Sequence, residues 1–230
     1  MSLESIPAGA KPSATLATSA YEQLRADLLA GRFRPGEKLR AELLRTRYNT
    51  GSSPIREALN RLLAEGFVLL EEQKGFRVAP ISKDELRELV KARCWIDGAA
   101  IRESVASGGQ AWEEGLVLAY HRLSRASRWM GDAPCSSNPD WERLHRAFHT
   151  ALVSGCGSRW MCRFSEQLFD KAERYRLLAC ARFPERNERE EHHAILEACL
   201  DRNADEALRL LGLHYSSTLE IILGSDLALD

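Results

Sequence analysis

The stretch that decides the fold covers residues 52–80 and reads SSPIREALNRLLAEGFVLLEEQKGFRVAP. Ser53 is a suitable N-cap, Pro54 fits the first helical position, and a glycine follows the last apolar turn. Apolar residues recur three or four positions apart before that glycine, which is the spacing of one buried helix face. Two short apolar runs separated by a polar turn follow within 67–78. The pattern predicts a helix over about 54–65 and then a small β-hairpin.

Two more helices are expected before this stretch. Leu24 and Leu28 lie one turn apart in the first helix, which starts near Tyr21 and ends at Gly31. A short second helix follows the turn at Pro35. Three short helices and a hairpin are the parts of a winged helix-turn-helix.

The remainder of the chain shows only helical periods. A capping box beginning at Ser82 opens the first of these helices. Breaks are expected at 108–109, 132–139, 155–157, 183–184 and 201–203. We therefore predict a mainly α protein with a flexible arm over 1–18, a winged helix-turn-helix domain over 19–80, and an all-α domain of six or so helices over 81–230.

The net charge of −1 conceals a basic segment. Residues 31–56 hold seven Lys and Arg residues against two Glu residues. Such a segment favours an anionic partner for the first domain, and a solvated basic face is the alternative. A recognition helix presents its N-terminal end to base edges in the major groove, and a wing tip approaches the groove with a lysine and a glycine. The candidate DNA-binding residues are Arg40, Arg47, Ser52, Ser53, Arg56, Lys74 and Gly75.

Four of the six histidines suggest a metal site. His145 and His149 share one face of a helix, while His192 and His214 belong to two later helices. Imidazoles from three helices can hold zinc or a similar divalent ion, although a histidine in a helix is more often a polar surface group. A metallohydrolase is the alternative function, but no HExxH motif occurs, and none of the four histidines has a carboxylate at a fixed spacing.

Other features narrow the class of protein. No apolar run is long enough for a membrane span and no signal peptide is evident, so we expect a cytoplasmic protein with no membrane partner. The six cysteines form no CxxC pair and are expected to be free, mostly buried thiols.

The run from Pro54 to Leu59, followed by Glu65-Gly66 and then Gly75 to Val78, resembles the GntR family of bacterial transcription regulators. The helical half is similar to the FadR-type (FCD) effector domain of that family. This resemblance implies a homodimeric repressor, and not an enzyme, that binds an inverted-repeat operator in double-stranded DNA. A small carboxylate effector, such as glutarate or a related dicarboxylate, would release it. Ser52 stands where many members carry an arginine, which weakens any transfer of their operator sequence.

The resemblance also implies a ligand set of one acidic residue and three histidines. His149, His192 and His214 match the three histidines, and His145 stands where many members have an aspartate. We interpret His145 as a substituted ligand, the alternative being a water in its place. The ion would be zinc, with nickel or manganese as alternatives. A shielded divalent charge on neutral ligands favours an anionic effector. The candidate effector-binding residues are Arg93, Arg174 and Arg176, whose alternative role is an ordinary salt bridge.

Overall fold

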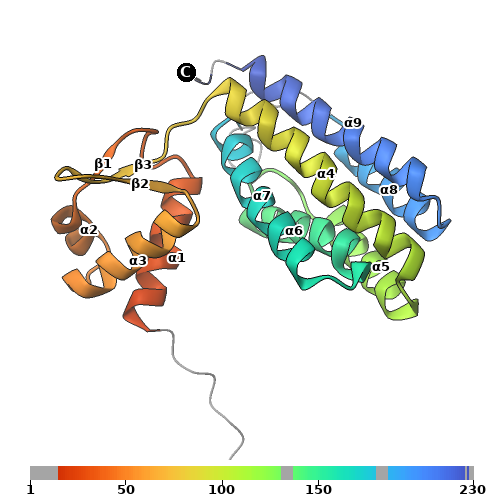
Figure 1. The fold of residues 1–230 in the computed structure, drawn as a ribbon, viewed down its shortest axis with the longest axis horizontal. Helices are drawn as coiled ribbons and strands as arrows, with labels where there is room; N and C mark the ends of the chain where they lie inside the picture. Colours follow the sequence, from red (N-terminus) through yellow and green to blue (C-terminus); the bar gives the residue numbers. More distant parts are fainter. Residues whose placement is uncertain (1–14, 131–136, 180–185, 226, 228–230) are drawn as a thin grey trace, which may run out of the picture. The chain divides into compact units, whose positions relative to one another are not determined.

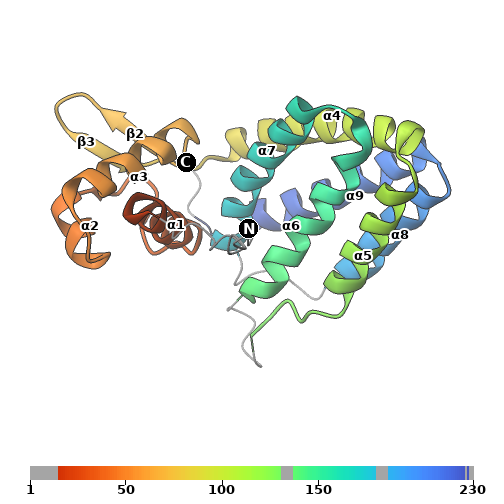
Figure 2. The same ribbon diagram turned by 90° about the horizontal axis from the view of Figure 1, so that it is seen from below.

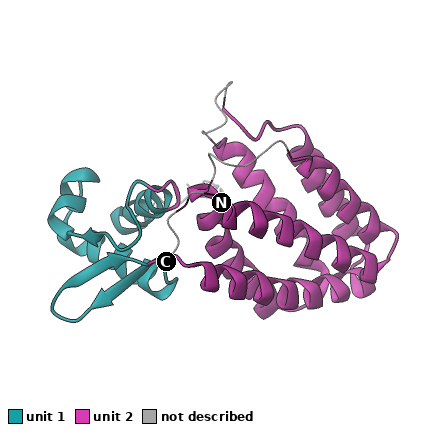
Figure 3. Ribbon diagram, turned by 90° about the horizontal axis from the view of Figure 1, so that it is seen from above, with its two compact units in different colours: residues 1–28, 32–79 teal, residues 29–31, 80–230 magenta. Residues whose placement is uncertain are grey.

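The computed structural model describes residues 15–130, 137–179, 186–225 and 227. The described part is mainly α-helical with one small sheet (Figure 1). The chain divides into two compact units, one made of residues 1–28 and 32–79 and the other of 29–31 and 80–230 (Figure 3). No helix among the described residues is long and apolar enough to cross a membrane.

The first unit has the elements of a winged helix-turn-helix. In chain order they are α1 (Leu16–Leu29), β1 (Lys38–Leu39), α2 (Ala41–Arg47), α3 (Ser52–Ala64), β2 (Val68–Glu71) and β3 (Gly75–Val78). The strands form an antiparallel sheet in the order β1-β3-β2, with β3 pairing with both neighbours. The helix and hairpin expected from the deciding stretch are therefore present.

Three details of this unit differ from the sequence expectation. Helix α1 begins at Leu16, so the last residues assigned to the arm are helical, and residues 1–14 lie outside the described part. Helix α3 begins at Ser52 with Gly51 as its N-cap, so Ser53 lies inside the helix and caps nothing. Strand β1 was not expected, because two residues are too few to show a period.

A buried carboxylate joins α1 to α2. Asp27 is 4% exposed and accepts hydrogen bonds from Arg47 and from the Tyr48 hydroxyl, both at 2.8 Å. Arg32 contacts its other oxygen at 2.5 Å. These contacts link Asp27 of α1 to the C-terminal end of α2. Leu24 of α1 and Leu59 of α3 are fully buried in the same unit.

The second unit consists of helices only. Its elements are α4 (Lys83–Ser107), α5 (Gln110–Ser124), α6 (Pro139–Val153), the 3₁₀ turn η1 (Ser154–Cys156), α7 (Arg159–Leu178), α8 (Glu188–Leu200) and α9 (Ala204–Leu223). Six α-helices in the described residues match the expected number. The breaks predicted at 108–109, 155–157 and 201–203 are observed. The break predicted at 183–184 lies outside the described residues, as does most of the one at 132–139.

Helix α4 is the long central element of this unit and packs against α7 and α9 (Figures 1 and 2). The capping box is confirmed, since the Ser82 side chain accepts a hydrogen bond from the backbone N–H of Glu85 at 3.0 Å. The apolar core includes Ile101, Phe148 and Ile195, all fully buried. Because this core joins α4, α6 and α8, it places the polar faces of several helices around one interior point.

Candidate functional site

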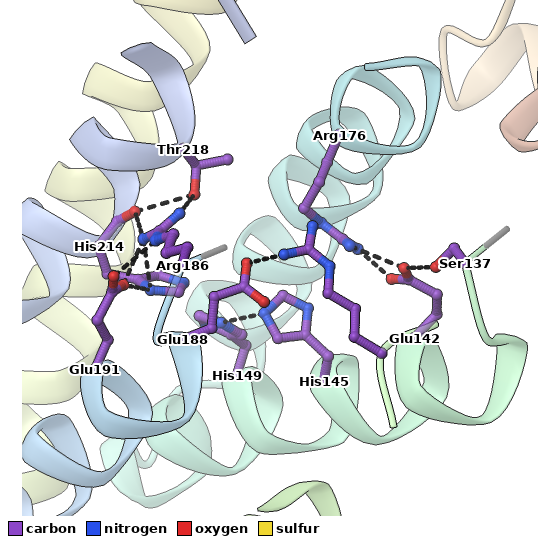
Figure 4. Close-up of polar contacts among 11 residues, drawn as sticks. Ser137, Glu142, His145, His149, Arg176, Arg186, Glu188, Glu191, His214 and Thr218 are labelled. Atoms are coloured by element: carbon purple, nitrogen blue, oxygen red, sulfur yellow. Dashed lines mark hydrogen bonds and ion pairs between the residues drawn. The ribbon is translucent and has the colours of Figure 1, made fainter. Parts of the chain in front are cut away.

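The four histidines singled out by their spacing meet inside the helical unit. His145 and His149 come from α6, His192 from α8 and His214 from α9. One ring nitrogen from each lies within 4.8 Å of those of the others, and every side chain is buried. Figure 4 shows His145, His149 and His214 at this point. The convergence that spacing alone left open is therefore present.

The donor atoms suit a cation. The Nε2 atoms of His145 and His149 lie 3.1 Å apart. The Nδ1 atoms of these two residues and Nε2 of His192 are buried without a hydrogen-bond partner. Four imidazoles that each bring one nitrogen to a shared buried point form a donor set that fits a divalent cation. Zinc–nitrogen bonds are about 2.0–2.1 Å long, so the four donors need only small shifts to share one ion.

The imidazoles are held in the neutral form that binds metals. Burial, together with repulsion from neighbouring histidines, lowers the pKa of His145, His149 and His192 well below the usual value. Burial also lowers the pKa of His214, although Glu191 opposes the shift. Neutral rings with free lone pairs need not lose a proton before they coordinate an ion.

A carboxylate and an arginine orient one of the four rings. Nδ1 of His214 lies 2.8 Å from Oε2 of Glu191, which leaves its other nitrogen for the cluster. Arg186 donates to Oε1 of Glu191 at 2.6 Å, and to Oγ1 of Thr218 and the carbonyl of His214, each at 2.8 Å. Burial alone would raise the pKa of Glu191, but the bonds from His214 and Arg186 lower it to about 2. The network, drawn in Figure 4, ties α8 to α9.

A cavity of about 30 Å³ adjoins the histidines and is lined in part by α4 and α7. Arg93 of α4 lines it, and no hydrogen bond of its side chain is found within the described part of the chain. Its Nε lies 3.5 Å from Oδ2 of Asp97, and its guanidinium stacks 3.9 Å above the ring of Tyr215. The Tyr215 hydroxyl donates to the same Asp97 oxygen at 2.7 Å. Arg93 therefore retains donors for an anion in the cavity.

The other two candidate arginines lie on α7 and differ from Arg93. Arg176 also lines the cavity, but it donates two hydrogen bonds to Glu142. Burial opposes both charges, yet their pairing lowers the pKa of Glu142 and raises that of Arg176. Arg174 is buried, does not line the cavity, and lies near Glu85. Two residues apart on one helix is about 200° of rotation, so only one of the pair can face the cavity.

The N-terminal end of α3 is open to solvent. Ser52, Ser53 and Arg56 are exposed in its first turns, and none of these three side chains has a hydrogen bond within the described residues. Asn60 is exposed one turn beyond Arg56 and was not among the candidates. Its four-residue spacing from Arg56 was the available signal, since that spacing keeps two side chains on one face. An asparagine there can pair with an adenine edge.

The remaining DNA-binding candidates of the first unit differ in exposure and in their partners. Arg40 is the exposed N-cap of α2, whereas Arg47 is held by Asp27. Lys74 is exposed at the tip of the hairpin, with Nζ 4.0 Å from Glu71. Gly75 has a φ of +84°, which permits the tight turn between β2 and β3.

Each of the two units matches a known protein family model. The family model described as bacterial regulatory proteins, gntR family, matches residues 16–78, and the FCD domain model matches residues 88–217. The chain belongs to the GntR family of bacterial transcription regulators, in the FadR-type group with an FCD domain.

Two relatives show the likeness over most of the chain. The uncharacterized HTH-type transcriptional regulator BphR of Paraburkholderia xenovorans is 37% identical over 209 residues, covering 90% of this chain and 85% of the relative. The HTH-type transcriptional repressor GlaR of Escherichia coli is 36% identical over 207 residues, covering 88% and 93%. The solved structure of E. coli McbR/YncC has a TM-score of 0.71 at 20% identity, with coverage of 91% and 97%. Because these relatives are regulators, the metallohydrolase alternative has no support.

The sequence analysis missed Arg186 and Glu191 as functional candidates. Glu191 precedes His192 on α8, but its carboxylate meets His214 of α9. Arg186 lies before the helix, in a segment without a period. No local pattern signals the contacts of Glu191 and Arg186 with α9, because His214 and Thr218 lie more than 20 residues further along the chain.

We expect Arg186→Ala to lower the free energy of unfolding of the helical unit by about 2 kcal/mol, because Glu191 loses its buried charged partner. Denaturant titration followed by tryptophan fluorescence measures this, since all five tryptophans lie beyond residue 90. A chelator keeps the protein free of metal. Arg189→Ala, at an exposed arginine three residues further along in α8, should change the value by less than about 0.5 kcal/mol. Equal effects of the two substitutions would show that the Arg186 network does not stabilise the unit.

Proposed function

We propose that this regulator is a homodimeric repressor that binds a divalent ion and a small carboxylate effector in its helical domain, and leaves its operator when the effector binds. The observation that carries the proposal is the buried group of four histidines beside Arg93 and the small cavity. A relative named as a transcriptional repressor, 36% identical over 88% of this chain, supports the direction of regulation.

Operator binding is proposed to use α3 of each subunit. The exposed first turns of α3 would enter a major groove, with Arg56 on a guanine or a phosphate and Ser52 and Ser53 near the backbone. Lys74 and Gly75 at the wing tip, together with Arg40, would contact the flanking DNA. Two subunits related by a two-fold axis require an inverted-repeat operator. Because a regulator of this kind binds the bacterial chromosome, we propose that it acts in the cytoplasm.

We expect Arg56→Ala to weaken binding to a selected operator duplex by about 1–3 kcal/mol, because a bidentate base contact is lost. Binding to random duplex of the same length should weaken less. Mobility-shift titrations at fixed salt measure both affinities. Arg122→Ala, an exposed arginine of α5, serves as the matched control and should leave both unchanged. Unchanged operator affinity of Arg56→Ala would remove this residue from the reading surface.

The metal site is proposed to use all four histidines. Neutral imidazoles suit zinc and nickel, whereas manganese prefers carboxylate oxygen, so we favour the first two. A bound divalent ion would supply a positive charge and an open position for a carboxylate oxygen. Glu191 would hold the His214 ring in place through Nδ1. Because all four proposed ligands are neutral imidazoles, they would leave the positive charge of the ion uncancelled.

Purified protein should contain about one divalent ion per chain, and His149→Ala or His214→Ala should lose it and unfold at a lower temperature. Elemental analysis and thermal unfolding measure the two effects. His193→Ala is the matched control, because that ring is 55% exposed and lies 3.6 Å from Glu197. His145→Ala should retain the ion with weaker affinity. Full retention in all four variants would exclude the proposed site.

The effector is proposed to be a short dicarboxylate such as glutarate. One carboxylate would meet the positive centre at the histidines and the other the free donors of Arg93. A cavity of about 30 Å³ holds a few atoms only, so an effector must separate the helices that line it. Arg93 belongs to α4, which begins five residues after β3 ends. A shift of α4 would therefore reach the DNA-binding unit directly along the chain.

We expect glutarate to bind the metal-loaded protein at least about tenfold more tightly than the metal-free protein, a coupling of about 1.4 kcal/mol. Calorimetric titration of both forms measures this. Arg93→Gln should abolish most of the binding, and Arg87→Gln, an exposed arginine of the same helix paired with Asp84, should not. Equal affinity of the two forms would leave the ion as a brace for the helices, without a role in binding the effector.

A further inference from the structure

Two cysteine thiols lie against each other at the junction between α6 and α7. Sγ of Cys156, in the 3₁₀ turn, lies 3.7 Å from Sγ of Cys162, in the first turns of α7. Both residues are partly exposed. Of the other described cysteines, Cys199 is buried and Cys94 is half-buried, and neither has a thiol neighbour among the described residues. The expectation of mostly buried thiols is therefore wrong for this pair and for Cys94, and among the described cysteines it holds for Cys199.

We propose that Cys156 and Cys162 form a reversible oxidation site, which closes to an intramolecular disulfide when the protein meets a peroxide. The proposal does not depend on a metal or on an effector. It rests on the contact between the sulfur atoms of two partly exposed residues and on the backbone around them.

The backbone permits the closure. A disulfide requires the sulfur atoms to approach to about 2.05 Å, so they must come closer by about 1.7 Å. Gly157, which follows Cys156, has a φ of +69° and open space where a Cβ would lie, so the backbone after Cys156 can adjust. Gly155, which precedes Cys156, packs closely on Trp112, since a Cβ there would lie 2.9 Å from the ring, so the backbone before Cys156 has little room to move. The movement therefore belongs to the Cys156 side chain and Gly157.

The thiols are held only weakly where they are. Sγ of Cys162 contacts the carbonyl oxygen of Val153, and Sγ of Cys156 contacts that of Ser158, each at 3.6 Å. Thiol hydrogen bonds are weak, so rotation of either side chain has a small cost. A new covalent bond outweighs both.

The two cysteines have different parts in the reaction. We assign the attack to Cys156, because it lies in the turn beside the open Gly157, whereas burial and the neighbouring Cys156 raise the pKa of Cys162 to about 11. The Cys156 thiolate would attack the peroxide, break its O–O bond and become a sulfenic acid, with one water released after proton transfer. Sulfur of Cys162 would then displace the hydroxyl of the sulfenic acid as a second water. Two thiols and one hydrogen peroxide thus give one disulfide and two waters, and a dithiol reductant restores the thiols.

The position of the pair gives the modification a route to the candidate site. The turn that would be cross-linked follows α6, which carries His145 and His149, and leads into α7, which carries Arg176. A disulfide would fix the corner between these helices. It would thereby restrict any separation of α6 from α7 around the cavity.

The test uses the full-length protein treated with a small excess of hydrogen peroxide and then alkylated under denaturing conditions. Trypsin cleaves after Arg146, Arg159 and Arg163, so each cysteine of the pair lies on its own peptide. Mass spectrometry should find these peptides joined and lighter by two hydrogens, with separate peptides after treatment with a dithiol. Cys94 and Cys199, the internal controls, should be oxidised at least about tenfold more slowly.

Two variants show which cysteine reacts first. In Cys162→Ser, Cys156 should be trapped as a sulfenic acid by dimedone, and no joined peptide should form. In Cys156→Ser, Cys162 should remain alkylatable. Oxidation of the wild-type pair no faster than that of Cys94 and Cys199 would overturn the proposal. A wild-type product in which Cys156 is a sulfinic acid, or is joined to a third cysteine, would overturn it as well.

Discussion

The convergence of four imidazole rings on one buried point is the constraint on which the helical unit depends. Within the described part of the chain, one buried ring nitrogen each of His145, His149 and His192 has no hydrogen-bond partner. Buried polar atoms weaken a core unless something satisfies them. The helices that supply the rings are far apart in sequence. An ion bound where the rings meet would join α6, α8 and α9, and it would stabilise the folded unit because it binds only that state.

Charge around this point is mostly balanced within the protein. Arginines and carboxylates near the cavity are matched as Arg128–Glu188, Arg146–Asp170, Arg176–Glu142 and Arg186–Glu191. Removing one partner of such a pair leaves a poorly solvated charge. These paired groups therefore stabilise the helical unit, and their charges are not available to a ligand. Arg93 differs, because its ion pair with Asp97 is longer, at 3.5 Å, and its guanidinium lies over the Tyr215 ring. This difference makes α4 the element on which an anion in the cavity would act.

Much of the fold follows from short-range patterns. The helix after Gly51, the hairpin behind it and the opening of α4 at Ser82 were all predicted from residues a few positions apart. Capping, period and turn chemistry are local, so they can be recognised without the tertiary structure. The errors were local as well. The N-cap was placed at Ser53 instead of Gly51, and strand β1 is too short to carry any pattern.

Less of the histidine site than of the fold could be predicted from the sequence. The sequence by itself determined which residue types were available, and the four-residue spacing put His145 and His149 on one face. Only the tertiary structure brought His192 and His214 to that face, gave Glu191 to the His214 ring and turned Arg174 away from the cavity. The physical reason is that helical periodicity specifies directions within one helix. Which helices meet, and at what rotation, is decided by the packing of their apolar faces over long separations in the chain.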